Sequence, residues 1–257
     1  MNYSDSHEAC QLARLFLRVL ALLPWNFKST ILNRFCMINY RIIHIIILLW
    51  LILANTTHMV LRESNKNKKI LLIGPISYAA MSFFKFCALY RRGKIIGQCM
   101  DHINDDWIRI KNKKYKELMR INMQWGKRAT MACALLMYAG AISYNLIMPA
   151  SVHIITNRDN DSTRMPIFPG YDFAFNCQNS PVYEIVFVTY FYVAFIGYTV
   201  TICSNHLAIL SVSHIYGQLE ILEEYMKNIT NAVSLKNKKI LHQKIVIIVN
   251  HHCRITE

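Results

Sequence analysis

The side chains that could do acid–base or metal chemistry in this chain are few and poorly placed for it. The densest acidic group, Asp101, Asp105 and Asp106, lies beside Arg109, where a surface ion pair is the ordinary role of such residues. The two histidines and the cysteine at 251–253 are adjacent, and adjacent residues rarely direct their ligand atoms to one tetrahedral metal ion. No nucleophile with a partner base stands out. The sequence therefore predicts a protein that is not an enzyme and that needs no cofactor or metal ion.

Four apolar stretches divide the chain. They cover residues 42–60, 70–90, 129–148 and 183–212, and a hydrocarbon core of roughly 30 Å needs about 20 residues of helix. Hydrophobic residues make up 54% of the chain and charged residues only 17%, whereas a soluble domain has roughly 25% charged residues. These features predict an all-α fold, a polytopic transmembrane helical bundle with long cytosolic helix extensions.

The basic residues are sorted by side of the membrane. Of the 29 lysines and arginines, 22 fall in residues 1–41, 91–128 and 213–257, and six fall in the loops 61–69 and 149–182. Basic residues near span ends are retained on the cytosolic side, so the N-terminus is predicted to be cytosolic, although the short loop 61–69 is itself basic. The net charge of +14 then faces an anionic inner leaflet rather than a nucleic acid.

The outer loop 149–182 carries two further signals. Asn160, Asp161 and Ser162 form a glycosylation sequon on the side where glycosylation happens, so Asn160 is predicted to be modified. Cys177 is the one cysteine expected to face outward, so no intrachain disulfide is predicted.

Two cytosolic segments show helical periodicity. Within residues 1–41, apolar residues at helical spacing predict an interfacial amphipathic helix. This apolar stripe consists of Leu12, Leu15, Phe16, Val19, Leu20 and Leu23. Within residues 91–128, a second stripe predicts that the neighbouring spans continue into the cytosol as long helices, and it includes Ile96, Met100, Ile103, Trp107 and Ile110. The basic outer face of this second segment is interpreted as solvated charge near lipid headgroups, with a partner surface as the alternative.

Motifs in order along the chain resemble those of the insect odorant receptors. Residues 180–185 (SPVYEI) enter the fourth span and residues 214–222 (HIYGQLEIL) follow it. Residues 22–25 (LLPW), Lys85 within the second span, and the loop with Pro166 and Pro169 add to the match. Two positions depart from the pattern, because Tyr190 stands where many relatives carry Gln and Asn205 where many carry Asp.

This resemblance implies an odorant-gated, non-selective cation channel, assembled as a heterotetramer with a co-receptor subunit in the plasma membrane of olfactory sensory neurons. The family is characterised by seven spans, and residues 213–257 look like the helix that leads to the fifth. The four spans of this chain alone are therefore not expected to conduct ions. A gustatory-type receptor of the same inverted topology is an alternative. A transporter is disfavoured, because no helix-breaking repeat is evident.

Ligand pockets of the family lie in the outer half of the bundle among the second, third, fourth and sixth spans. Counting inward from the outer span ends gives the implied odorant-binding residues: Tyr78, Met81, Met137, Tyr138, Ala141, Tyr144, Phe187, Tyr190 and Phe191. Methionine and aromatic walls suit small apolar volatiles, although packing or lipid contact is the ordinary role of such residues. The polar residues His44, Asn145 and Asn205 are expected to face other helices and to hydrogen-bond there.

Overall fold

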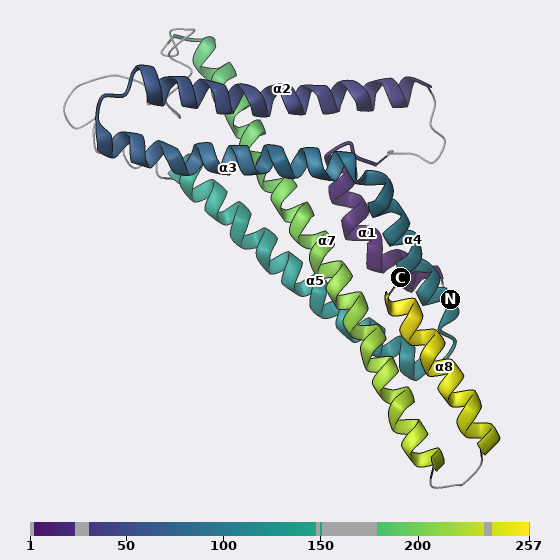
Figure 1. Ribbon diagram of the computed structural model, residues 1–257. Helices are drawn as coiled ribbons and strands as arrows, with labels where there is room; N and C mark the ends of the chain where they lie inside the picture. Colours follow the sequence, from purple (N-terminus) through teal and green to yellow (C-terminus); the bar gives the residue numbers. More distant parts are fainter. Residues whose placement is uncertain (1–2, 24–30, 148–149, 151–178, 234–237, 257) are drawn as a thin grey trace. The chain divides into compact units, whose positions relative to one another are not determined.

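The computed structural model describes residues 3–23, 31–147, 150, 179–233 and 238–256 (Figure 1). Every regular element in this part of the chain is helical, which confirms the predicted all-α class. The elements are α1 (Tyr3–Val19), α2 (Ile31–Leu61), α3 (Lys66–Arg91), α4 (Gly93–Arg109), α5 (Lys113–Ile142), the π-helical segment η1 (Ser143–Ile147), α7 (Val182–Val233) and α8 (Lys238–Thr256). Asn160, Cys177 and the loop prolines Pro166 and Pro169 lie outside the described residues.

Four stretches of helix are long and apolar enough to cross a bilayer. They are Phe35–Leu61, Leu72–Arg91, Lys113–Ile147 and Val182–Ile229. The helix α7 has 52 residues, or roughly 78 Å at about 1.5 Å per residue, against a hydrocarbon core of about 30 Å. A helix of this length must continue well beyond the bilayer, so the prediction of long extensions is confirmed.

The helices belong to two compact units. We call Ala13–Ile95 with Ala132–Ser204 the span unit, because it holds most of the apolar helical length. We call Met1–Leu12 with Ile96–Met131 and Asn205–Glu257 the extension unit. The long helices α5 and α7 each contribute their apolar part to the first unit and their more polar part to the second.

In the span unit, α2 and α3 pack side by side (Figure 1). The connection between them is short, which favours an antiparallel pair. Its last residue, Asn65, caps α3, because its side-chain oxygen accepts a hydrogen bond from the backbone N–H of Asn67 at 2.9 Å. This bond satisfies one of the backbone donors that a helix start leaves without a partner.

In the extension unit, glycine lets α5 and α7 approach closely. A Cβ atom built at Gly126 would lie 2.3 Å from Ser213 Oγ, and one at Gly217 would lie 3.3 Å from the Met119 Cα. Side chains larger than hydrogen do not fit at Gly126 without movement of α7 residues. The two glycines therefore set the spacing of this helix pair.

The helix of the second span ends at Arg91 and does not continue as a single long helix. The helix α3 ends at Arg91, Arg92 leaves the helical conformation with ψ of 8°, and α4 begins at Gly93. The third-span helix does continue, since α5 already begins at Lys113. The stripe predicted within 91–128 is buried at Met100, Ile103 and Trp107, so it acts as the core-facing side of α4.

The buried face of α1 includes Cys10, Ala13 and Leu17, whereas Leu15 of the apolar stripe is 53% exposed. Two of the three buried residues are small and permit close approach, with Cys10 Sγ 4.0 Å from the Met100 carbonyl oxygen of α4. An exposed leucine is compatible with a helix at the membrane interface, and the interfacial position of α1 stays a prediction.

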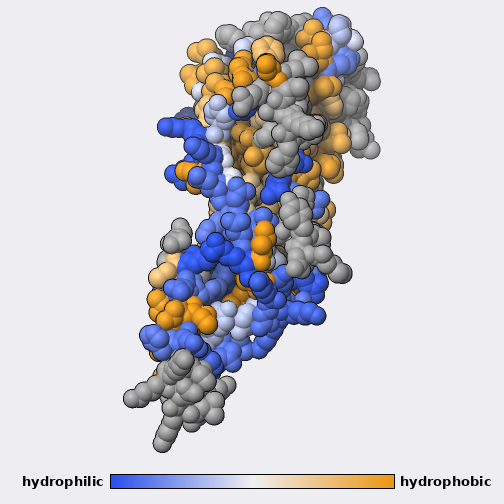
Figure 2. Space-filling model, turned by 90° about the vertical axis from the view of Figure 1, so that its right-hand side faces the viewer, coloured by the Kyte–Doolittle hydropathy of each residue, from blue (hydrophilic) through white to orange (hydrophobic). Residues whose placement is uncertain are grey.

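The surfaces of the two units differ in polarity. On the face seen in Figure 2, hydrophobic side chains gather over the span unit and hydrophilic ones prevail over the extension unit. Large apolar side chains of α2 are exposed, among them Ile42, Ile46, Trp50 and Leu53. An exposed apolar surface of this extent is what a lipid-facing helix requires.

Candidate ligand-binding cavity

A cavity of about 410 Å³ lies within the span unit among α2, α3, the η1 segment and α7. Of the described residues that line it, none carries a charge. Its aromatic wall consists of Tyr78, Tyr144, Tyr190 and Tyr198. A space of this size, mostly apolar and with a few polar groups, has the properties of a small-molecule site.

Small residues create the space. Gly74, Ala79, Ala194 and Gly197 line the cavity from α3 and α7. At Gly197 an added Cβ would come within 3.5 Å of Ser82 Oγ and 3.6 Å of a Tyr78 ring carbon, which is ordinary van der Waals contact. A methyl group at Gly197 would therefore fit against α3 without forcing the helices apart.

One polar pair fixes part of the wall. Tyr190 donates its hydroxyl to Asn145 Oδ1 at 2.6 Å, and the Asn145 amide donates to the carbonyl oxygen of Ala141 at 2.7 Å. Both side chains are buried, with 6% exposure for Tyr190 and 5% for Asn145. Because both polar ends of Asn145 are used, the amide holds the Tyr190 ring in one orientation against the cavity.

A second asparagine offers an acceptor to the cavity. Asn55 is 3% exposed and donates its amide N–H to the Leu51 carbonyl oxygen at 2.7 Å. Its Oδ1 atom has no hydrogen-bond partner among the residues that the structure describes. A buried acceptor without a partner is costly, so a ligand hydroxyl or N–H at this place would be stabilised.

Three of the nine residues predicted from the resemblance lie on the cavity wall, namely Tyr78, Tyr144 and Tyr190. The others lie elsewhere in the span unit. Tyr138 bonds Thr199 at 2.9 Å and stacks on Phe195. The remaining five do not line the cavity: Phe187 and Phe191 pack on one another with ring centroids 4.8 Å apart, Met81 is 57% exposed, Met137 is half-buried and Ala141 is also half-buried.

Sequence reasoning left out the contribution of α2. The first span supplies Leu48, Leu51 and Asn55 to the cavity, whereas the prediction drew only on later spans. A polar asparagine within an apolar run was the available signal, as was the pairing of Gly74 with Pro75 inside the second span. Both are unusual enough in a span to mark a position with a special neighbour.

The three polar residues expected to face other helices have different outcomes. His44 is 1% exposed and its Nε2 lies 2.8 Å from the Tyr192 hydroxyl, and Asn145 is bonded as described, so both predictions are confirmed. Asn205 is exposed, so the prediction for this residue is wrong. It falls where the chain passes into the more polar extension unit, in which an asparagine has no need to face another helix.

The extension unit contains a buried charged cluster. Asp106 is 5% exposed, accepts a hydrogen bond from His214 Nε2 at 2.9 Å, and pairs with Arg254, while His102 Nε2 lies 3.6 Å away. Burial by itself raises the pKa of Asp106, but the hydrogen bonds and charges of His214 and Arg254 outweigh it and hold that pKa below its ordinary value. The predicted surface ion pair with Arg109 is wrong for Asp106, because α4 directs this carboxylate toward α7 and α8.

The fold and the cavity define a multi-pass helical membrane protein with an internal space of ligand size. Residues 70–257, well over half of the chain, match the family model described as 7tm Odorant receptor. The chain therefore belongs to the 7tm odorant receptor family, which confirms the resemblance seen in the sequence. This family consists of receptors rather than enzymes, and the match favours the odorant branch over a gustatory-type receptor.

A solved structure agrees with the family assignment. The chain is similar over 99% of its length to the structure of the insect olfactory receptor OR5 from Machilis hrabei, with a TM-score of 0.73 and 14% sequence identity. At this identity the similarity shows the fold alone. The aligned region covers 64% of that receptor chain. No curated protein matches the chain.

Proposed function

We propose that this chain is the ligand-recognising part of an odorant receptor subunit and that its span unit binds a small volatile molecule in the cavity beside Tyr190. The observation that carries the proposal is the cavity itself, about 410 Å³ of uncharged, tyrosine-lined space among four helical segments. Ligand sites of small molecules have this size and polarity. Membership of the odorant receptor family supports the class of ligand.

The polar groups narrow the chemistry of that ligand. The wall offers an acceptor at Asn55 Oδ1 and no charged partner. A neutral volatile with one hydroxyl or N–H group on an apolar body satisfies both conditions. An organic acid or amine would be ionised at neutral pH and would lose its hydration without an opposite charge in return. The favoured class is therefore small alcohols and phenols.

Three tyrosines are proposed as direct contacts, namely Tyr78, Tyr144 and Tyr190, because they line the cavity. The other six residues of the predicted set are proposed to support the wall from outside it. Phe191 is an example, since it packs edge to face against Tyr190. Substitution of these supporting residues should alter ligand affinity less than substitution of the three tyrosines.

The proposal is tested by filling the cavity. Ala194→Phe places a ring in the space, and Ala139→Phe adds the same ring to an exposed position of α5 that does not line the cavity. Each protein is purified in detergent, and its thermal stabilisation by a panel of volatile alcohols, ketones and acids is measured. We expect alcohols to raise the melting temperature of the parent chain and of Ala139→Phe, but not of Ala194→Phe.

Two results would contradict the proposal. Equal stabilisation of both phenylalanine variants would place the ligand outside the cavity. A preference for acids over alcohols would contradict the ligand class. An Asn55→Leu variant separates the two parts, because it should weaken the binding of alcohols while leaving the binding of apolar volatiles without a hydroxyl unchanged.

We further propose that the chain lies in the plasma membrane with its N-terminus cytosolic and that it acts with a co-receptor subunit as an odorant-gated, non-selective cation channel. The distribution of basic residues supports the orientation, and the family supports the partner. Glycosylation of Asn160 and its loss in Asn160→Gln would support the orientation, and an N-terminal epitope stained on intact cells would contradict it.

Gating has its own test. The receptor that contains this chain is expressed with a co-receptor subunit, and currents evoked by volatiles are recorded from whole cells. We expect Ala194→Phe to abolish the evoked current and Ala139→Phe to retain it. Evoked current no larger than that of the co-receptor alone, in both the parent and Ala139→Phe, would contradict the proposed role.

A further inference from the structure

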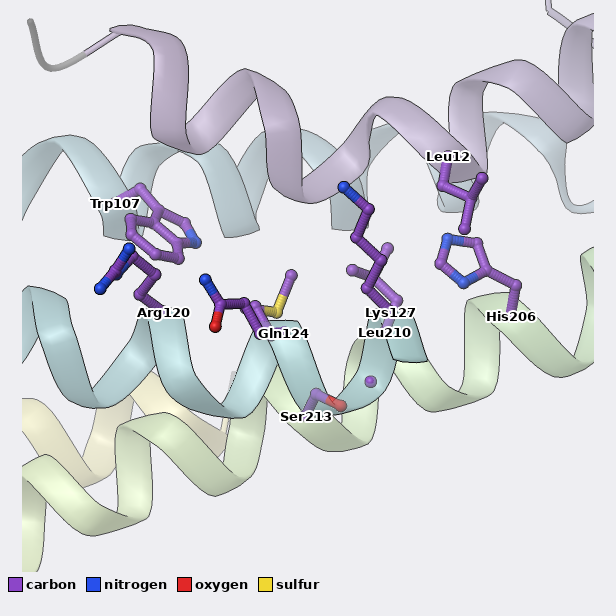
Figure 3. Close-up of a pocket in the computed structure, with 10 residues that line it drawn as sticks. Leu12, Trp107, Arg120, Gln124, Lys127, His206, Leu210 and Ser213 are labelled. Carbon is purple, nitrogen blue, oxygen red and sulfur yellow. The ribbon is translucent and has the colours of Figure 1, made fainter. Parts of the chain in front are cut away.

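The extension unit contains a cavity of its own, about 190 Å³, among α1, α4, α5 and α7 (Figure 3). Two of its residues are basic, Arg120 and Lys127 on α5, and none of the described residues that line it is acidic. Leu12 and Leu210 give it an apolar side. We propose that this cavity binds an anionic, phosphate-bearing amphiphile, with the phosphate at the basic rim and the first part of its apolar body against the leucines.

Trp107 supplies an independent reason to expect a ligand. Its side chain lines the cavity from α4, the residue is 4% exposed, and its indole Nε1–H has no hydrogen-bond partner among the described residues. In Figure 3 the nitrogen edge of the ring faces the side on which Gln124 and Lys127 lie. An indole N–H can only donate, and a buried donor without a partner is costly. An acceptor such as a phosphate oxygen would satisfy it.

The two basic residues supply the positive charge that an anion requires. Lys127 is exposed at the rim of the cavity. Arg120 uses two of its donors on Glu117, at 2.9 and 2.7 Å, and both side chains of this pair are about half exposed, at 54% and 50%. Ion pairs of this exposure contribute little, so a phosphate competes effectively with Glu117 for the guanidinium. Bidentate contact with phosphate is the geometry that arginine favours.

The size of the cavity limits what enters it. A volume of about 190 Å³ is below the roughly 300 to 1,000 Å³ typical of sites that enclose a whole drug-sized ligand. It holds a headgroup phosphate and a short apolar part, and the remainder of the molecule must lie outside. Basic pockets among helices on the cytosolic side of a membrane suit anionic lipid headgroups. The choice of the inner leaflet as the source of the lipid rests on the proposed function, in which the N-terminus is cytosolic. The rest of the inference does not depend on that orientation.

The experiment compares probes that share a phosphate. The chain is purified in detergent, and binding is measured as the shift in melting temperature with dioctanoyl phosphatidylinositol 4-phosphate, dioctanoyl phosphatidylcholine, inositol 1,4-bisphosphate and inorganic phosphate. We expect the anionic lipid to stabilise the protein at the lowest concentration and the zwitterionic lipid to have no effect. If inorganic phosphate stabilised the protein at the same concentration as the anionic lipid, the proposal that the ligand is an amphiphile would be overturned.

Variants locate the binding. Lys127→Gln should weaken binding of the anionic lipid about tenfold and Lys127→Arg should retain it, since a hydrogen bond to a charged group is strong. Trp107→Phe keeps a ring and removes the N–H, and it should weaken binding about threefold or more. The matched control is Lys113→Gln, which removes the same charge from the same helix at an exposed position outside the cavity.

The outcomes are separable. If Lys113→Gln weakens binding as much as Lys127→Gln, general surface charge is responsible and the site is overturned. If Trp107→Phe binds as tightly as the parent, the indole donor plays no part and the proposal fails in this form. Should Trp107→Phe lower the melting temperature without ligand, the exposed Lys127 variants still decide. Ala194→Phe should leave lipid binding unchanged and Lys127→Gln should leave volatile binding unchanged, so failure of one proposal does not imply failure of the other.

Discussion

Among the residues that the structure describes, the buried polar side chains around the span-unit cavity are neutral, whereas the extension unit buries a charge. The buried polar groups around the cavity are amides and hydroxyls, such as those of Asn55, Ser82 and Asn145. In the extension unit, the buried carboxylate of Asp106 forms ion pairs with His214 and Arg254. Within a bilayer, an ion pays a large desolvation cost, while a neutral amide needs only one or two partners. Position along the long helices therefore decides which chemistry a buried contact uses.

The difference has a consequence for function. A cavity with neutral walls favours ligands that are themselves neutral, while a buried carboxylate between α4, α7 and α8 fixes these helices to one another through charge. Neutral contacts contribute roughly 0.5 to 1.5 kcal/mol each, and loss of one partner of a buried ion pair costs more. The two regions should therefore differ in their response to substitution and to pH.

The largest effect is expected for Asp106→Ala. It leaves Arg254 and His214 without their acceptor, and removal of one partner of a buried pair costs about 3 to 5 kcal/mol. Since the Arg254 side chain is 23% exposed, the lower end of this range is expected. The measurement is the free energy of unfolding in detergent, with Asp105→Ala as the control, because Asp105 is an exposed carboxylate of the same helix.

The pH dependence of Asp106 sharpens this result. A carboxyl whose folded-state pKa lies below its unfolded-state value contributes stability above the unfolded value, about 3.9, and loses it as pH falls through the folded value. The groups that face it are His102, His214 and Arg254. The stability difference between the parent and Asp106→Asn should shrink as the pH falls below about 4. A difference that persists unchanged at lower pH would show that the charge is not the cause.

Gly126→Ala is expected to be next in size. The added Cβ would lie 2.3 Å from Ser213 Oγ, and forced overpacking costs about 1 to 3 kcal/mol. The matched control is Gly140→Ala in the span unit, where an added Cβ meets nothing within 4 Å. That change should be neutral or stabilise the helix by up to about 1 kcal/mol. Thermal unfolding of both variants measures the contrast, and equal effects would contradict the close approach of α5 and α7.

A good part of this fold could be predicted from the sequence, and the reasons are local. Long apolar runs and sorted charges identify the four span helices, because each signal lies within one segment. The stripe with Met100, Ile103 and Trp107 likewise predicted the buried face of α4. The break between α3 and α4 was missed, since the only local signal at Arg92 is the glycine that follows it.

The candidate site was harder to predict than the spans. Its nine residues were placed by depth along each span, and depth does not say which face of a helix points inward. Tyr138 on α5 and Tyr144 in the η1 segment both belong to the third span, yet one bonds Thr199 and the other lines the cavity. The role of Asp106 was also hidden, because its partners His214 and Arg254 lie more than a hundred residues away in the chain.

A smaller effect is expected for Tyr190→Phe. The variant loses the hydroxyl that donates to Asn145 Oδ1 at 2.6 Å, and a neutral hydrogen bond contributes about 1 kcal/mol, with a further cost if the acceptor stays unsatisfied. Because neither group is charged, the effect should not change between pH 4 and pH 8. A comparable variant without this bond change is Tyr216→Phe, at a position of the same helix that is 57% exposed. Strong pH dependence of the Tyr190→Phe effect would contradict the distinction between the two regions.

The smallest effect is expected for an exposed charge pair of the extension unit. Lys114 Nζ donates to Glu224 Oε1 at 2.6 Å, with side-chain exposures of 62% and 25%. Lys114→Gln should reduce the free energy of unfolding only slightly, because water already stabilises both groups. The loss should diminish further in about 1 M salt, where the screening length falls to about 3 Å, whereas the effect of Asp106→Ala should persist. Equal salt sensitivity of the two variants would show that burial does not separate them, and the contrast between buried and exposed charge would have to be abandoned.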